Sequence, residues 1–220
     1  MDFVFPRNNN LNYSSIHKYL TKKEIDIQSP KLKVLNSKSR KYLDGVFLAS
    51  RYNNALIAEL LERLKFGLEY KIVDDLVELL YQKVWVDSYY FIPDPDYIVP
   101  VPNDPKRFLQ RGFSVSALIA SGLAKKVDKL VIHIINKKIS TIEQSKLERE
   151  KREKNLKGVF ELAEKEYNLS QKEVIWLIDD VSTTGTTLLE CAKLLKKKYP
   201  FLQIYGVVVS GNGLLGFYII

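Results

Sequence analysis

Two adjacent acids, Asp179 and Asp180, precede a run of hydroxyl residues around a glycine in the segment VIWLIDDVSTTGTT, residues 174–187. As ionised acceptors, the two carboxylates suit a pair of sugar hydroxyls. The hydroxyls and backbone N–H groups of the loop suit a phosphate. The candidate loop residues are Ser182, Thr183, Thr184, Gly185, Thr186 and Thr187. This segment therefore has the chemistry to hold both a ribose and its 5′-phosphate.

The flanking elements are expected to bring the acids and the loop to one edge of a sheet. Residues 174–178 form a short apolar run, typical of a buried parallel strand. Apolar residues then repeat at helical spacing, at Leu188, Cys191, Ala192 and Leu195. A strand, a tight loop and a helix should meet at residues 182–187, where Gly185 can bend without hindrance from a Cβ atom. Open α/β sheets bind ligands at this carboxyl end of a strand.

The same residues also have a purely structural interpretation, in which the Asp pair caps the helix and the threonines form a turn. The Walker A motif is excluded, because the chain contains no G-x-x-x-x-G-K-S/T string. Ligand binding is the interpretation that the acids and hydroxyls together favour.

Length and charge fit one enzyme-sized domain with an anionic partner. The chain has 220 residues, 46% of them hydrophobic, which is enough for a substantial core. We expect an extension over residues 1–44 and one domain over 45–220. The net charge of +8 favours pyrophosphate-bearing small molecules or nucleic acid, and charge alone does not separate the two. Aromatic residues are not visibly interleaved with the cations, as a base-stacking platform would prefer.

Cysteine use and hydropathy exclude several classes. One cysteine permits no intramolecular disulfide, and its spacing from two histidines matches no zinc site. The N-terminus shows no signal-peptide pattern, and no apolar stretch approaches the roughly 20 residues of a membrane helix. We therefore expect a cytoplasmic protein without zinc.

Apolar periodicity predicts an α/β fold with a parallel sheet and helices on both faces. Short β-like runs occupy residues 46–50, 97–101, 130–135, 174–178 and 204–209. Helical spacing covers 56–64, 72–80 and 115–122, with a break at 66–67, and a charged helical stretch is expected over 143–157.

A second segment, IVPVPNDPKRFLQRGFS at residues 98–114, supplies cations beside a strand end. Its prolines should end the strand and force an extended loop. Lys106, Arg107 and Arg111 would then surround the entrance to the next helix. Guanidinium groups match phosphate oxygens, so these residues are candidates for a pyrophosphate, although three nearby cations can equally be a solvated surface.

Residues 174–186 resemble the phosphoribosyl pyrophosphate (PRPP) signature of type I phosphoribosyltransferases, which have a Rossmann-like fold. Taken with other motifs, the chain resembles the ComF family of phosphoribosyltransferase-like competence proteins. Family-like motifs are carried by Leu64, Lys65, Phe66, Gly67, Pro100, Val101, Pro102, Arg107, Arg111, Gly112, Phe113, Thr141, Gln144, Leu147, Arg152, Asn155 and Phe160. The resemblance spans residues 45–210.

The resemblance implies PRPP binding by Asp179, Asp180 and the loop, with transfer of the phosphoribosyl group to an unknown acceptor and release of pyrophosphate. Mg²⁺ would be held mainly by the substrate, with help from the two acids. Residues 137–160 would form a flexible loop over the site, contributing Lys137, Lys138, Gln144 and Arg152. Such a transferase (a pentosyl glycosyltransferase) would be linked to natural competence and DNA uptake. Competence proteins, single-stranded DNA and a second copy of the chain are the implied partners. The alternative is a noncatalytic PRPP sensor or an adaptor in DNA import.

The sequence departs from family patterns in three respects, which bear on the zinc ribbon, on the residues after Arg-Gly-Phe and on the acceptor. ComF proteins usually begin with a cysteine-rich zinc ribbon, but no cysteine precedes Cys191. Ser114 and Val115 replace the usual Asn-Gln after Arg-Gly-Phe. Purine-salvage relatives carry a third carboxylate where this chain has Thr183, and a hydroxyl is no base near neutral pH, which disfavours hypoxanthine or guanine as acceptor.

Overall fold

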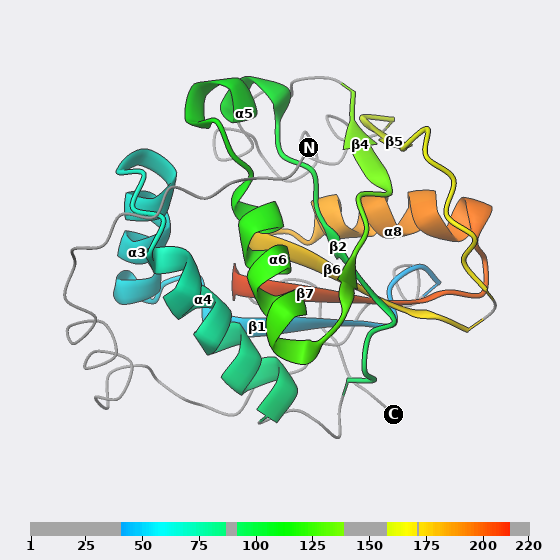
Figure 1. Ribbon diagram of the computed structural model, residues 1–220, viewed down its shortest axis with the longest axis horizontal. Coiled ribbons are helices and arrows are strands. Elements are labelled where there is room, and N and C mark those ends of the chain that lie inside the picture. The colour runs from blue at the N-terminus through cyan, green and yellow to red at the C-terminus, as the bar shows by residue number, and fades with distance from the viewer. Residues whose placement is uncertain (1–40, 87–91, 139–157, 171, 212–220) are drawn as a thin grey trace.

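A five-stranded parallel sheet forms the centre of the protein (Figure 1). The computed structural model describes residues 41–86, 92–138, 158–170 and 172–211. The strand order is β1-β7-β6-β2-β3, with β1 at Gly45–Arg51, β7 at Gln203–Gly211, β6 at Val174–Ser182, β2 at Tyr97–Pro100 and β3 at Leu130–Val131. β6 lies between β7 and β2, so the strand that carries the acids is central.

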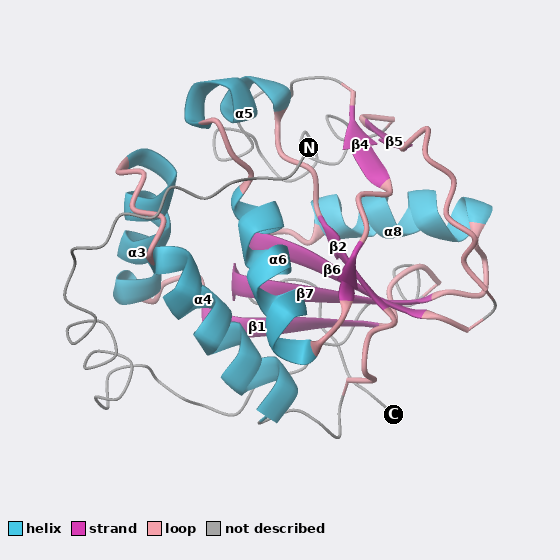
Figure 2. Ribbon diagram, in the orientation of Figure 1, coloured by secondary structure: helices cyan, strands magenta, loops and turns pink. Residues whose placement is uncertain are grey.

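Helices cover both faces of this sheet, as the sequence predicted (Figure 2). One face packs against α3 (Ala55–Phe66), α4 (Ile72–Leu80) with its π-helical continuation (Tyr81–Val86), and α6 (Val115–Val127). The other packs against α8 (Thr186–Lys198), whose Cys191 is fully buried as expected of a core residue. Alternate residues of β6 supply the two cores: Trp176 and Ile178 on the α3 side, Ile175 and Leu177 on the α8 side.

Asp44 ties the residues just before β1 to the rest of the fold. Its Oδ2 accepts the backbone N–H of Ile204 at 2.7 Å and lies 3.1 Å from Nζ of Lys196. The neighbouring Leu43 is 1% exposed within the α8-side core. Residues 43 and 44 therefore join the sheet and α8, immediately before β1.

The expectation of one strand over 130–135 is wrong. Leu130–Val131 forms a short edge strand beside β2, and the chain then leaves this sheet to form β4 (Ile135–Lys137). β4 pairs antiparallel with β5 (Phe160–Leu162) in a separate two-stranded sheet. A run of apolar residues predicts burial, but it does not mark the point at which a strand changes partner.

The loop expected after β2 contains a short helix, α5 (Pro105–Arg111). The Asp104 side chain accepts the backbone N–H of Lys106, and proline occupies the first turn, both of which are ordinary signals of a helix start. Gly112 ends α5 at a φ of 78°, where glycine is favoured. Ser114 then caps α6 by accepting the N–H of Ala117. The family's Asn is thus replaced by another residue that caps helices well.

The predicted flexible loop is closed at its base, where Lys137 pairs with Phe160 across β4 and β5. The charged helix expected over 143–157, the loop candidates Gln144 and Arg152, and residues 1–40 lie outside the described residues. Within the ranges that the structure does describe, no helix has the length and hydropathy to cross a membrane.

Trp176 generates a prediction about stability. It is 1% exposed, its Nε1 donates to the carbonyl of Pro93 at 3.0 Å, and its ring meets Trp85 edge-on. Trp176→Ala should lower the free energy of unfolding by about 3–5 kcal/mol, because it leaves a cavity at the centre of the sheet. Urea denaturation measures the change, with Phe201→Ala, at a ring 62% exposed, as the control. A loss below about 1 kcal/mol would contradict this account of the core.

Candidate functional site

The two acids lie within β6 itself, because the strand extends to Ser182 through pairing of Val181 with Ser210 on β7. They are therefore not helix caps: α8 begins after Gly185 without a capping side chain. β2 ends earlier, at Pro100 opposite Ile178, so β6 projects beyond its neighbour by the length that carries the acids. The structural interpretation of the pair as caps does not hold.

Asp179 is buried and held by hydrogen bonds. Its Oδ1 accepts from Oγ of Ser116 on α6 at 3.2 Å and from the backbone N–H of Asp180 at 2.9 Å. The side chain is only 8% exposed. Burial, reinforced by the charge of Asp180, raises the pKa of Asp179 well above its ordinary value.

Asp180 forms an ion pair with Lys65 of α3. Burial opposes ionisation of Asp180, but the Lys65 charge and several hydrogen bonds outweigh it, so the pKa of Asp180 is lowered. The two adjacent acids are thus shifted in opposite directions. Neighbouring carboxyl groups with separated pKa values can take different roles at one site.

The loop after the acids has the shape of a phosphate-binding turn. Gly185 adopts a φ of 71° and precedes the first turn of α8, whose backbone N–H groups begin there. Oγ1 of Thr184 and Oγ1 of Thr186 lie 2.8 Å apart. Ser182 and Thr186 are buried, while Thr183, Thr184 and Thr187 are partly exposed.

The cations predicted to bind a pyrophosphate lie on α5 and differ in their exposure to solvent. Lys106 and Arg107 are exposed, and Arg111 is half-buried. Burial and the nearby charge of Arg107 lower the pKa of Arg111, while the charge of Asp180 acts in the opposite direction. The charge of Arg107 on α5 and the charge of Asp180 on β6 therefore both act on Arg111.

Lys137 and Lys138, both expected in the flexible loop, have different positions. Nζ of Lys137 lies 3.4 Å from Oδ2 of Asp104, with both side chains 9% exposed. Lys138 instead pairs with Glu161 on β5, at 2.7 Å and with both side chains exposed. The structure thus brings Lys137 to the loop that precedes α5, whereas Lys138 pairs within the β4–β5 sheet.

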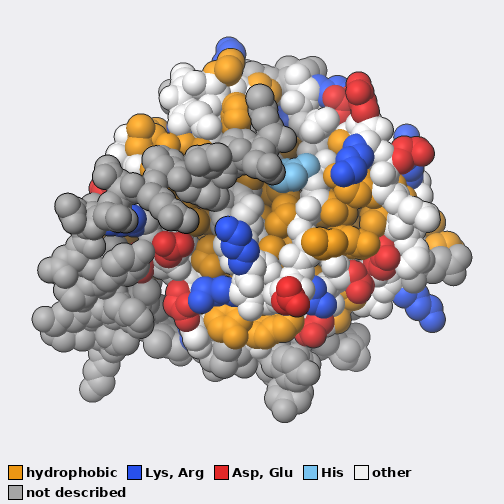
Figure 3. Space-filling view, in the orientation of Figure 1, with side chains coloured by type: hydrophobic (Ala, Val, Ile, Leu, Met, Phe, Trp, Pro, Cys, Tyr) orange, Lys and Arg blue, Asp and Glu red, His pale blue; other side chains and the backbone are white. Residues whose placement is uncertain are grey.

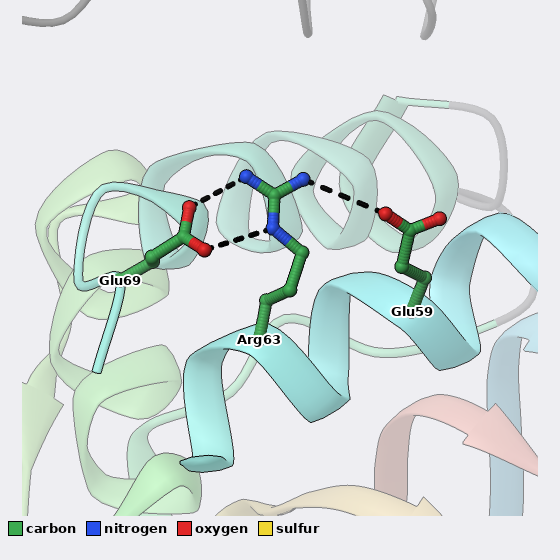
Figure 4. A network of polar contacts seen from close by, with 3 residues as sticks. All are labelled: Glu59, Arg63 and Glu69. Atoms are coloured by element: carbon green, nitrogen blue, oxygen red, sulfur yellow. Dashed lines mark hydrogen bonds and ion pairs between the residues drawn. The ribbon is translucent and has the colours of Figure 1, made fainter. Parts of the chain in front are cut away.

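The turn after α3 is braced by a polar network (Figure 4). Arg63 donates through Nε to Glu69 at 2.9 Å, and its Nη1 lies 3.7 Å from Glu59 one turn earlier. Gly67 ends the helix by donating to the carbonyl of Arg63. This turn carries Phe66, whose ring lies 4.9 Å below the guanidinium of Arg111. The α3 turn and the end of α5 are thereby joined.

Sequence reasoning missed three residues of this site. Lys65 belongs to a motif with family resemblance, but no role for it follows from spacing. Ser116 has no local signal, because its partner is 63 positions away. Nδ2 of Asn103 is the one buried side-chain N or O atom without a hydrogen-bond partner among the described residues. Since such donors are costly to leave unpaired, Asn103 offers a hydrogen bond to a ligand oxygen.

The site offers few ligands to a metal of its own. Among the described residues, no group of three or more His, Cys, Asp or Glu side chains could hold an ion. Two carboxylates are present, and one of them is engaged by Lys65. These residues fit a divalent cation only if a bound substrate supplies most of its oxygen ligands.

Relatives by sequence include a competence protein and several DNA utilization proteins. Competence protein F of Haemophilus influenzae is 34% identical over 151 residues, which are 67% of this chain and 66% of that protein. DNA utilization protein YhgH of Salmonella typhi is 34% identical over 141 residues, 62% of this chain and 59% of its own length. YhgH of Escherichia coli K12 is 30% identical over 141 residues, 63% of this chain and 60% of its own length. No family model matches the chain.

Some solved structures resemble the fold at low similarity. Adenine phosphoribosyltransferase from Leishmania tarentolae has a TM-score of 0.45 at 10% identity, covering 84% of this chain and 96% of that one. UMP synthase of Leishmania donovani has a TM-score of 0.37 at 17% identity, covering 69% of this chain and 24% of that one. No conclusion about function rests on these likenesses.

The parallel sheet and the strand-loop-helix turn define an α/β protein with helices on both faces of the sheet, as predicted from the sequence. Within that class, the chain belongs to the family of competence protein F and YhgH. It spans about two thirds of the length of competence protein F and about three fifths of YhgH.

The raised pKa of Asp179 predicts that the ionised form of this acid lowers the free energy of unfolding. Asp179→Asn keeps an oxygen to accept from Ser116 and Asp180 but carries no charge. Because the folded-state pKa is raised, the cost of the ionised group is absent below its ordinary value of 3.8 and full above the folded-state pKa. Asp179→Asn should therefore raise the free energy of unfolding by about 1 kcal/mol or more at neutral pH, and the gain should shrink as the pH falls toward 4. Urea denaturation at several pH values, with the exposed Asp74→Asn as control, checks the trend. A pH-independent gain would refute it.

Proposed function

We propose that the chain binds PRPP at the end of β6 and transfers its phosphoribosyl group to an acceptor with release of pyrophosphate. The observation that carries this proposal is the combination of the buried Asp179 and the largely shielded Asp180 with a glycine turn that opens α8. The acids supply acceptors for ribose hydroxyls, and the turn supplies donors for the 5′-phosphate. In keeping with its relatives' names, the protein would act in cytoplasmic handling of imported DNA.

The cations of α5 support the assignment of the pyrophosphate end. The charge of Asp180 acts on Arg111, and the exposed Arg107 lies one turn earlier on the same helix. Asn103, with its unpartnered amide, precedes this helix. Displacement at ribose C1 leaves negative charge on the departing pyrophosphate, which these donors would stabilise. Lys106 lies in the first turn of α5 and adds charge that attracts the ligand.

The two acids would interact with the ribose. As the bond from C1 to pyrophosphate lengthens, positive charge develops on the ribose, and an ionised Asp180 would offset it. Mg²⁺, when bound with PRPP, would neutralise pyrophosphate oxygens, with Asp179 and Asp180 as the protein groups available to it. Thr183 offers no carboxylate to a purine acceptor, so the acceptor remains open on the chemistry of this site.

Loss of both acidic charges tests PRPP binding. Asp179→Asn with Asp180→Asn should weaken PRPP by about 100-fold or more in the presence of Mg²⁺, because charged hydrogen bonds contribute about 1.5–3 kcal/mol each. Calorimetry measures the affinity, and release of pyrophosphate across a panel of bases and amines measures turnover. The adjacent acids of α4 give a matched control, Asp74→Asn with Asp75→Asn. Unchanged affinity in the site variant would refute the assignment. Binding without pyrophosphate release would favour a sensor.

A second candidate function, contact with single-stranded DNA, is favoured by one surface observation. Phe66, Lys106, Arg107, Phe108 and Arg111 form what we call the α3–α5 rim. Phe66 is 75% exposed and Phe108 is 40% exposed, and Arg111 stacks on Phe66. Figure 3 shows hydrophobic and basic side chains together over α5 at the top of the view. Aromatic residues are thus interleaved with cations in space, contrary to the expectation from sequence, and this mixture suits unpaired bases and their phosphates.

The α3–α5 rim predicts that Phe66→Ala with Phe108→Ala weakens binding of an oligothymidine by about tenfold or more, since base stacking contributes about 1–3 kcal/mol per base. Fluorescence anisotropy at about 50 mM and about 200 mM salt checks the effect and its ionic component. Phe201→Ala, at an exposed ring before β7, is the matched control. No binding by the unmodified protein at the lower salt would remove this candidate.

A further inference from the structure

Lys65 brings a positive charge to the acids from outside both motifs of the candidate site. It extends from the last turn of α3 and pairs with Oδ2 of Asp180. The pair is largely shielded from water, with the Lys65 side chain 20% exposed and that of Asp180 15% exposed. Such a pair is screened by salt far less than one on the open surface.

The alternation of β6 explains how Lys65 reaches this acid. Trp176 and Ile178 face the core formed with α3, and Asp180 is the next residue of that series. α3 is anchored on the same face through Leu60 and Leu64, so Lys65 follows directly after a buried contact. The braced turn shown in Figure 4 fixes where the helix ends.

Two adjacent carboxylates are negatively charged and would repel a ligand that carries phosphates at both ends. Like charges held close together repel one another, and more strongly where little water screens them. In this protein the repulsion is reduced twice, because the pKa of Asp179 is raised and the charge of Asp180 is offset by Lys65. Arg111 is a further cation on which the charge of Asp180 acts.

We propose that Lys65 is a positioning residue of the PRPP site: it holds Asp180 in place as the acceptor for a ribose hydroxyl and cancels its charge toward the incoming phosphates. This inference rests on the proposed function. Lys65 acts through Asp180, so its contribution depends on that carboxylate. Arg111 is stacked on Phe66, the residue after Lys65, so one turn of α3 serves both the sugar end and the pyrophosphate end.

The test measures PRPP affinity in the full chain with Mg²⁺ present. Lys65→Met should weaken PRPP about tenfold or more, the usual size of a lost charged hydrogen bond. Lys65→Arg should recover affinity to within about threefold, because the charge is kept. In the Asp180→Asn background, weak PRPP binding is followed by two-dimensional NMR. There, Lys65→Met should weaken PRPP binding by less than about a further twofold. Lys126→Met, which breaks a similar lysine–glutamate pair with Glu78 on α4, is the matched control and should bind as the unmodified protein does.

The outcomes separate this inference from the proposed function. If the unmodified protein binds PRPP and Lys65→Met binds it equally well, the inference on Lys65 is wrong and the PRPP site stands. An equal loss in both backgrounds, accompanied by a lower melting temperature, identifies a purely structural lysine and also overturns the inference. No binding of PRPP by the unmodified protein overturns both.

Discussion

Two neighbouring carboxyl groups in a central strand, largely removed from water, are the constraint to which the surrounding structure responds. A buried carboxylate is costly unless it is paired or hydrogen-bonded. Here each acid has its own solution: Asp179 is bonded to Ser116 and shifted toward its neutral form, and Asp180 is ionised beside Lys65. Two helices on the same face of the sheet, α3 and α6, supply these partners. Their ends are therefore tied to the edge where ligands bind in open α/β sheets.

Positive charge near the same edge comes from α5. A short helix capped by Asp104 carries Lys106, Arg107 and Arg111 past the end of β2, and Asp104 also pairs with Lys137 of β4. The acids and the cations thus come from different elements, and the charge of Asp180 acts on Arg111. In the proposed function, the acids would face the hydroxyls of a phosphorylated sugar and the cations would face its phosphates.

The relatives of this chain are named for competence and for DNA utilization, and the proposed functions connect the site with such a role. Arg111 belongs to the α3–α5 rim, and the charge of Asp180 acts on it. The proposed small-molecule site and the proposed surface for unpaired bases would therefore share one guanidinium, and occupation of one would change the electrostatic field at the other.

The sequence alone determined the features that are contiguous or periodic. The strand of residues 174–178, the acids, the glycine turn and the parallel sheet with helices on both faces all follow from local pattern and composition. It failed where local pattern is silent: residues 130–135 divide between two sheets, and an expected extended loop contains α5. Only the tertiary structure decided that Lys65 pairs with Asp180, Ser116 bonds Asp179, and Phe66 stacks on Arg111. These contacts join residues far apart in the chain, and their geometry is set by how helices pack on the sheet, which no local spacing encodes.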